Sequence, residues 1–471
     1  MGTKSRFYAD VMSLNEEVTG SCHLCVVKMP NGETIKFIVD CGLFQESQYY
    51  KYNDSFPFNP DELAFALVTH NHTDHIGRLP LLAKLGFRSP ICTSEFTKIL
   101  MQESLKDSCG ILAQVAKRNN KKPLYDEDDL QTTLGLVQGY PYFTEIQVHE
   151  NVKVMFLDNG HLPGATMILV KISYHGEEDI TMLFTGDYSK HSTFFDVGEI
   201  PKHVFDLPLT IIQESTYATT YTDSIVKVFE ENVLKAVREG KTIIVPVFSL
   251  GRSQELMLKL KNMQDSGVLD KNIPIFLDGK LTMRYTLIYK SSSDMFKEEA
   301  KEFYPENLKF VTKAIRGSLL TNTDCKIILT SSGMGSYGPA PLYITNYISN
   351  EKALIHFVGY PAIGTLSRKL KDAQKEEFVK VGSILKQKMC DIEYTTEFSS
   401  HAKLDEILEF LKQFNKIQLI LVNHGEYECK ENLAKQVILN HLSKDVAVES
   451  RSTFYRIGRY GLIKELTTKF L

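Results

Sequence analysis

The chain has 471 residues, of which 43% are hydrophobic and 24% charged, and its formal net charge is −4. This length predicts two or three globular domains, and so small a net charge neither favours nor excludes an anionic partner. No apolar run approaches the ~20 residues needed to cross a bilayer, and Met1–Arg6 lacks the apolar start of a signal peptide. We therefore expect an intracellular protein without a membrane partner, cytoplasmic in the first instance, with a nuclear location left open.

The eight cysteines are scattered along a chain that is large enough to need no disulfide framework, which fits a reducing environment. Cys22 and Cys25 form a Cys-x-x-Cys pair, but no second pair accompanies it. Because the pair lies in an alternating run that predicts a strand, we expect buried strand cysteines there. A zinc or redox role is the alternative.

Short apolar strands alternate with turn residues up to about residue 215. They are predicted at 20–29, 33–40, 65–69, 152–157, 167–173 and 180–185. Helical patterns lie at 93–107 and around 126–137. This mixture predicts an α/β region with substantial antiparallel character.

Regular alternation of helix and strand begins at about residue 223. Helices are predicted at 224–239 and 252–266, and strands at 242–247, 273–277 and 326–330. Such short β-rich runs between helices are typical of a parallel sheet that is covered by helices. After about residue 390 strands return at 390–395 and 417–422, with a helix at 403–414 between them.

The most informative stretch is His70-Asn71-His72-Thr73-Asp74-His75. It follows an apolar run, 63–68, that predicts a buried strand, and it precedes a helix start at Leu79. Burying several imidazoles and a carboxylate without partners would cost several kcal/mol, whereas a divalent cation would neutralise them. We therefore expect a metal site here.

Four further polar residues stand where predicted strands end: Asp40, His161, Asp187 and His424. Strand ends are where α/β folds usually place chemistry, because the loops there converge on one edge of the sheet. Taken singly, each of the four would more simply be a structural histidine or a turn aspartate. Their order relative to the histidine loop is the informative feature.

That order resembles the five motifs of the metallo-β-lactamase superfamily: a strand-ending Asp, His-x-His-x-Asp-His, a His, a Gly-Asp pair and a late His. The resemblance implies an αβ/βα sandwich and a site for two zinc ions. Its expected ligands are His70, His72 and His161 for one ion, Asp74, His75 and His424 for the other, and Asp187 for both. Asp40 would orient a ligand or the bridging solvent.

An apparent insertion separates Asp187 from His424. It begins near Glu214-Ser215-Thr216-Tyr217, and Phe398-Ser399-Ser400-His401-Ala402 follows it. With Glu214, His401 and His424 at three added motif positions, the chain resembles the β-CASP group of nucleic-acid-processing enzymes.

The same resemblance implies the domain bounds and the fold class, which is α/β. We expect a metallo-β-lactamase domain in two parts, 1–212 and 390–471, with an inserted β-CASP domain at 213–389 that has a parallel sheet flanked by helices. Residues 120–125 resemble the helical arm of the RNA-processing branch. That branch contains the cleavage and polyadenylation specificity factor endonuclease subunit and its bacterial and archaeal relatives.

RNA is the expected substrate, because a histidine at the position of His424 is associated with RNA in this family, whereas DNA-directed members carry valine. The resemblance implies a zinc-dependent ribonuclease that hydrolyses phosphodiester bonds of single-stranded RNA with a hydroxide activated by two metals. His401 would protonate or hydrogen-bond the leaving oxygen, and Glu214 would hold its ring. The alternative for this pair is a buried ion pair that fastens the inserted domain to the core.

Three serines near strand ends offer hydroxyls to phosphate: Ser332, Ser399 and Ser400. A plain turn is the alternative for Ser332. Two other functions compete with the ribonuclease. A DNA nuclease of the same group is disfavoured by His424, and a catalytically silent scaffold subunit of an RNA-processing complex is disfavoured because such subunits lose metal ligands. Exonuclease or endonuclease mode, sequence preference and oligomeric state are left open.

Overall fold

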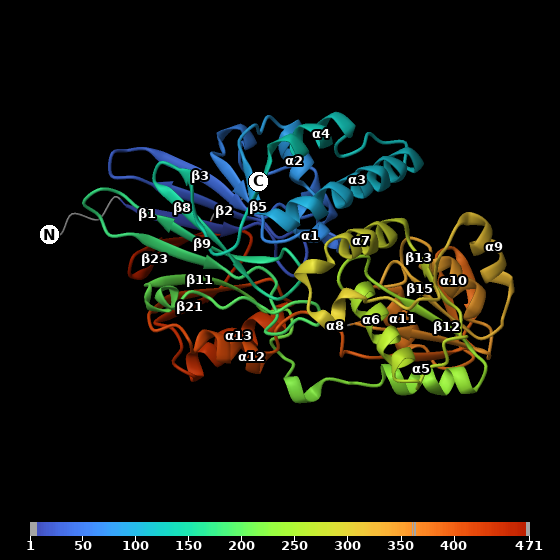
Figure 1. The fold of residues 1–471 in the computed structure, drawn as a ribbon. Coiled ribbons are helices and arrows are strands. Elements are labelled where there is room, and N and C mark those ends of the chain that lie inside the picture. Colours follow the sequence, from blue (N-terminus) through green and yellow to red (C-terminus); the bar gives the residue numbers. More distant parts are fainter. Residues whose placement is uncertain (1–6, 360, 362–363, 468–471) are drawn as a thin grey trace. The chain divides into compact units, whose positions relative to one another are not determined.

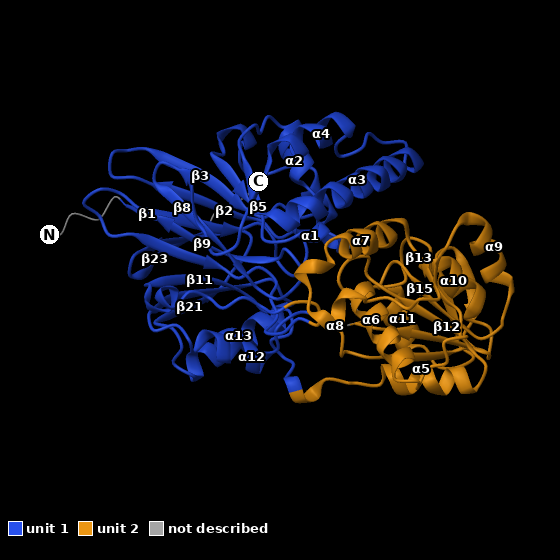
Figure 2. Cartoon of the chain, viewed as in Figure 1, with its two compact units in different colours: residues 1–192, 196–222, 400–471 blue, residues 193–195, 223–399 orange. Residues whose placement is uncertain are grey.

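The structure is a computed structural model that describes residues 7–359, 361 and 364–467. It divides into two compact units (Figure 2). Unit 1 comprises Met1–Ser192, Asp196–Thr222 and Ser400–Leu471, and unit 2 comprises Thr193–Phe195 and Asp223–Ser399. The domain bounds inferred from the sequence, with the insertion at 213–389, stay a prediction.

One sheet of unit 1 has eight strands, antiparallel at one edge and parallel at the other. In spatial order they are β23 (Gly461–Thr467), β22 (Thr453–Gly458), β1 (Tyr8–Ser13), β2 (His23–Lys28), β3 (Thr34–Val39), β4 (Phe65–Leu67), β5 (Ile91–Ser94) and β6 (Val137–Tyr140). The chain's last strands thus complete the sheet that its first strands begin.

The other sheet of unit 1 has seven strands. In spatial order they are β21 (Asp445–Val448), β20 (Ile417–Asn423), β11 (Leu209–Glu214), β10 (Ile180–Phe184), β9 (Thr166–Ile172), β8 (Val152–Asp158) and β7 (Glu145–His149). Strand β20 is added after the chain returns from unit 2. It pairs in parallel with β11, so Asn423 lies opposite Glu214 where both strands end.

The two sheets enclose an apolar core to which both contribute. Phe37 and Phe65 of the first sheet stack with ring centroids 4.8 Å apart, and Phe156 and Phe184 of the second are equally buried. This core depends on alternation along the strands, which sends every second side chain inward.

Helices cover the outer faces of this sandwich (Figure 1). Those packed on the eight-stranded sheet are α1 (Thr73–Ile76), α2 (Leu79–Lys84), α3 (Glu95–Arg118) and α4 (Glu127–Leu136), and those on the seven-stranded sheet are α12 (Leu404–Leu411) and α13 (Tyr427–Leu439). The predicted αβ/βα sandwich is confirmed. The helix predicted at 93–107 extends to Arg118.

Unit 2 is built on a six-stranded parallel sheet. Its spatial order is β14 (Leu308–Phe310), β13 (Ile275–Asp278), β15 (Lys326–Thr330), β12 (Thr242–Pro246), β16 (Ala353–Phe357) and β19 (Asp391–Tyr394). The strand expected at 390–395 is thus β19, which belongs to this sheet. The parallel sheet predicted for the insertion is confirmed.

The remaining elements of unit 2 surround that sheet (Figure 1). They are α5 (Phe229–Arg238), α6 (Arg252–Asp265), α7 (Lys280–Ser291), α8 (Glu298–Lys301), α9 (Lys313–Thr321), α10 (Ala340–Tyr347), α11 (Leu366–Asp372) and the hairpin of β17 (Phe378–Val381) and β18 (Ile384–Gln387). Short 3₁₀ helices occur in the chain at Ser47–Asn53, Pro60–Glu62, Lys202–Asp206, Thr222–Ser224 and Ser293–Met295. Within the described ranges, every helix is too short or too polar to cross a membrane.

Candidate metal centre

The histidine loop leaves the carboxyl end of β4 and enters α1. It lies against the turn that follows β3, where Gly42 packs on the backbone of Asp74. A Cβ atom at Gly42 would lie 1.5 Å from the Asp74 carbonyl oxygen, so only glycine fits there. The turn and the loop are therefore held in one fixed arrangement.

Asp40 ties the same turn to the loop through three hydrogen bonds. Its Oδ1 accepts from the Thr69 amide at 2.8 Å, and its Oδ2 accepts from the Thr69 hydroxyl and from His75 Nδ1, each at 2.8 Å. Because His75 Nδ1 is engaged in this way, Nε2 is the ring nitrogen that faces the other site residues. Asp40 thus orients a predicted ligand.

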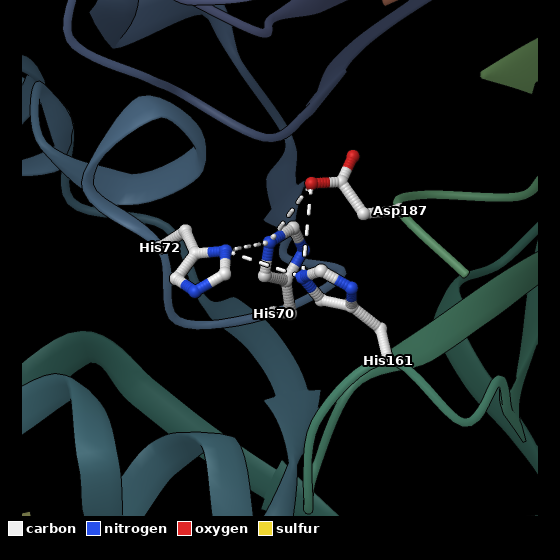
Figure 3. Close-up of side chains that lie close together, drawn as sticks. All are labelled: His70, His72, His161 and Asp187. Atoms are coloured by element: carbon white, nitrogen blue, oxygen red, sulfur yellow. Dashed lines mark hydrogen bonds and ion pairs between the residues drawn. The ribbon is translucent and has the colours of Figure 1, made fainter. Parts of the chain in front are cut away.

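His70, His72, His161 and Asp187 form one group, in which one ligand atom from each lies within 4.8 Å of all the others (Figure 3). His72 Nδ1 is 3.1 Å from His70 Nε2 and 3.2 Å from His161 Nε2. Asp187 Oδ2 lies 3.5 Å from His70 Nε2. These residues come from β4's loop, from the turn after β8 and from the end of β10.

Asp74, His75 and His424 form a second group. His75 Nε2 is 3.1 Å from His424 Nε2, which is 3.8 Å from an Asp74 oxygen. Asp187 reaches this group with its other oxygen, because Oδ1 lies 3.4 Å from His75 Nε2 and 3.3 Å from His424 Nδ1. The two oxygens of Asp187 therefore face different groups.

The surroundings of Asp187 fit a cation. Its Oδ1 is buried and accepts no hydrogen bond from any residue that the structure describes. Leaving such an oxygen without a partner is costly in a protein interior. Imidazole nitrogens and carboxylate oxygens are the donor atoms that zinc prefers, so the residues present fit zinc.

The protonation of the first group also suits a metal. Burial lowers the pKa of His72 to about 4 and holds the pKa of His70 and His161 well below the usual range. These rings are therefore neutral near pH 7, and a neutral imidazole has a lone pair to give to a metal.

In the second group, interactions between charged side chains outweigh burial in setting the pKa values. Burial acts to lower the pKa of His75, but Asp187 and Asp40 more than offset it and raise the pKa well above its usual range. Burial likewise acts to raise the pKa of Asp74, yet His424 and the other imidazoles lower it to about 2. The Asp74 carboxylate is thus ionised, as a metal ligand must be.

Glu214 and His401 lie beside the two groups. Glu214 ends β11, and its carboxylate oxygens accept from His401 Nδ1 at 3.0 and 3.2 Å. Glu214 Oε1 also accepts from the amide of Tyr188, the residue after Asp187, at 2.8 Å. Both residues of the pair belong to unit 1. His401 is also close to a predicted ligand, since its ring centroid lies 4.9 Å from that of His161.

Of the three predicted phosphate-binding serines, one falls in unit 1 and two fall in unit 2. Ser400 belongs to unit 1, and its carbonyl oxygen accepts from His161 Nδ1 at 2.8 Å, which leaves His161 Nε2 facing the ligand group. Ser332 and Ser399 belong to unit 2. There the Ser332 hydroxyl accepts from the Tyr337 amide at 3.2 Å.

Two residues that were not among the predicted site residues also contact the predicted ligands or their loops. Asn159 Nδ2 donates to the carbonyl oxygens of Thr185 and Asp187, and so ties the loop before His161 to the loop of Asp187. Thr216 Oγ1 lies 3.1 Å from His424 Nδ1. The turn-type run Asp158-Asn159-Gly160 was the available signal for Asn159.

Three family models match consecutive parts of the chain. The metallo-β-lactamase superfamily model matches residues 20–219, the β-CASP domain model matches 253–370, and the Zn-dependent metallo-hydrolase RNA specificity domain model matches 387–447. The first and third of these models include every residue of the two ligand groups.

Curated relatives are similar to this chain over most of its length. "Transcription termination factor FttA" of Methanocaldococcus jannaschii is 28% identical over 83% of this chain and 63% of its own length. "Ribonuclease TTHA0252" of Thermus thermophilus is 26% identical over 90% of this chain and 94% of its own length. "Endoribonuclease ysh1" of Schizosaccharomyces pombe is 25% identical over 88% of this chain and 53% of its own length.

The chain thus spans a little under two thirds of the archaeal termination factor and about half of the yeast endoribonuclease. The order of the three matched domains, together with the resemblance of most of the chain to these proteins, confirms the family inferred from the sequence. The chain belongs to the β-CASP group of the metallo-β-lactamase superfamily.

Proposed function

We propose that the chain is a zinc-dependent ribonuclease that hydrolyses phosphodiester bonds of single-stranded RNA. The observation that carries the proposal is the pair of ligand groups that share Asp187, one on each carboxylate oxygen. The printed names of relatives, a ribonuclease and an endoribonuclease among them, support an RNA substrate. So does the match to an RNA specificity domain.

Two zinc ions would be held by the two groups. The ligands would be His70, His72 and His161 for one, Asp74, His75 and His424 for the other, and Asp187 for both. A pair of bound zinc ions supplies Lewis acidity toward a phosphodiester and lowers the pKa of water. The protein's part is to hold the ligand rings, which it does with Asp40 on His75 and the Ser400 carbonyl on His161.

His401 is the residue that we assign to the leaving oxygen. Glu214 accepts from Nδ1, so that nitrogen carries a hydrogen, and Nε2 is left to hydrogen-bond or protonate the leaving oxygen. Since Glu214 also accepts from the Tyr188 amide, the ring of His401 and the backbone beside Asp187 share one carboxylate. Glu214 therefore sets the position of His401 relative to the ligand groups.

Phosphate contacts complete the proposal. Ser400 adjoins His401, and its hydroxyl would contact a phosphate oxygen of the bound strand. We assign the same role to Ser399 and Ser332, whose hydroxyls can donate to phosphate. Ser332 follows the carboxyl end of β15, an edge at which parallel sheets commonly bind ligands.

One assay tests the function. Matched single strands of RNA and DNA, labelled at either end, would be offered to the wild-type chain and to Asp187→Ala and His401→Ala. We expect RNA cleavage by the wild type, a loss of about 10²–10⁴-fold in His401→Ala as for a missing general acid, and no cleavage by Asp187→Ala. The matched control is Asp10→Asn, which alters an ion pair with Arg456 in the same unit, between β1 and β22.

Each other outcome has a definite meaning. Undiminished cleavage by Asp187→Ala would exclude the shared-ligand site, and preferential cleavage of DNA would favour the rival nuclease. A zinc-loaded chain that cuts neither strand would support a scaffold. A ladder from one labelled end indicates an exonuclease, whereas internal fragments indicate an endonuclease.

A further inference from the structure

A buried polar network lies within unit 1 where four strands end or begin. We call it the Asn423 network, and its members are Ser13, Asn15, His23, Asn423 and Glu449. Each is at most 7% exposed. Burying so many polar side chains between two sheets is costly unless they are fully paired, which suggests that their arrangement has a use.

The side-chain amide of Asn423 is the centre of this network. Its Nδ2 donates to Glu449 Oε2 at 2.6 Å and to Ser13 Oγ at 2.7 Å. Its Oδ1 accepts from Asn15 Nδ2 at 2.9 Å and from the backbone amide of His424 at 2.5 Å. Every donor and acceptor of the amide group is thus engaged.

Glu449 determines which way that amide faces. A carboxylate accepts hydrogen bonds and has none to donate, so the NH₂ end of Asn423 must point toward it. His23 Nε2 lies 3.0 Å from the same carboxylate oxygen and 2.9 Å from Asn423 Nδ2, so the NH₂ end of the amide faces both residues. The oxygen end of Asn423 is therefore directed at His424.

The backbone of His424 needs this support. Its φ is +48°, a left-handed conformation that residues other than glycine seldom adopt. The amide of this strained residue donates to Asn423 Oδ1, while the next residue, Gly425, has no room for a Cβ against Ser215. With the backbone in this conformation, the imidazole faces His75 and Asp187.

We propose that Glu449 is a positioning residue for His424, acting through the side-chain amide of Asn423. This inference rests on the proposed function, because the position of His424 matters as that of a metal ligand. It predicts a selective effect: removal of Glu449 weakens zinc binding by Asp74, His75 and His424 and leaves zinc binding by His70, His72 and His161 unchanged.

The test is zinc retention by the full chain during dialysis against graded chelator concentrations. Wild type should release its zinc in two steps. Glu449→Leu roughly keeps the side-chain volume but removes the acceptor. In this variant, the chelator concentration needed for one of the two release steps should fall by about 10–100-fold, the usual effect of losing a residue that orients a ligand. Glu449→Gln keeps an acceptor oxygen and should restore the wild-type curve.

His424→Ala identifies the step, since it should abolish the one that Glu449→Leu shifts. Asp10→Asn is the matched control, and neither step should move in it.

A folded Glu449→Leu chain with both steps unchanged, or with both shifted equally, would overturn the inference. If Glu449→Leu does not fold, Ser13→Ala removes a weaker partner of Asn423 and should shift the same step less, and no shift would again overturn it. A wild type that retains no zinc would instead contradict the proposed function.

Discussion

Asp40 Oδ2 accepts a hydrogen bond from His75 Nδ1 at 2.8 Å, although the two residues lie on different loops of the sandwich. Asp40 directly follows β3 and adopts a left-handed conformation with φ of +62°. A non-glycine residue in this conformation is uncommon and is often kept at functional sites. The strained turn places one carboxylate where it can hold both Thr69 and His75.

Asp40→Asn should weaken zinc binding by about 10–100-fold, because an NH₂ group accepts no hydrogen bond and the asparagine would lose one of the two acceptor oxygens that hold Thr69 and His75. Competition with a chromophoric chelator measures the zinc affinity. Asp10→Asn again serves as control, since Asp10 also bonds through both oxygens, to Arg456, but far from the ligands in sequence. Equal affinities of the wild type and Asp40→Asn would contradict a role in orienting His75.

Much of this site could be predicted because its signals are local. Four of the expected ligands lie within six residues, and each of the others lies within four residues of the end of an apolar run, which indicates a strand end. The supporting residues carry no such signal. Asn15 and Asn423 are 408 positions apart, and their contact depends on how the two sheets pack rather than on any local pattern.

The difference between local and long-range signals also explains where the predicted helices and strands differ from those in the structure. The helix predicted at 93–107 continues to Arg118. Its inward face continues through Cys109, Leu112 and Ala116, but the apolar residues Ile111 and Val115 are exposed and obscure the periodic pattern in the sequence. Strands β1, β22 and β23 were not predicted at all, because the pairing of Ala9 with Ile457 joins the two ends of the chain.

Gly42→Ala should disrupt the metal centre. The added methyl group would overlap the backbone of Asp74, and backbone cannot move aside as a side chain can. We expect a loss of at least about 3 kcal/mol in the free energy of unfolding, the upper end for overpacking. Urea melts measure it. Gly110→Ala is the control, because Gly110 lies within α3 with open space around it, and it should gain about 0.5–1 kcal/mol. Similar melts for the two variants would contradict this account.

The cysteines should differ in reactivity. Burial raises the pKa of Cys92 to about 11 and of Cys390 to about 12, and holds the pKa of Cys25 well above its usual range. A raised pKa lowers the thiolate fraction at pH 8, and the thiolate is the reactive form. Cys325, which is only half-buried, should therefore be alkylated first. Mass spectrometry after brief exposure to iodoacetamide measures this order, with urea-unfolded protein as control.

Early labelling of Cys25 would revive the alternative that Cys22 and Cys25 form a redox or zinc pair. The structure gives the opposite expectation, because both are buried and Cys25 lies within β2.

Removal of metal should destabilise unit 1 locally. Each ion that binds only the folded state adds about 2.7 kcal/mol at roughly 100 times its dissociation constant, and chelation removes that contribution. Without a cation, Asp187 Oδ1 also remains buried with no hydrogen bond from any described residue. Hydrogen exchange of the backbone amides, followed by mass spectrometry before and after chelation, measures the effect. Protection should fall in β10 and β20, which carry Asp187 and His424 at their ends.

The internal control is β12 in unit 2, whose sheet carries none of the proposed ligands, so its protection should not change. Equal losses in β12 and β20 would indicate general unfolding rather than release of ions from these two groups.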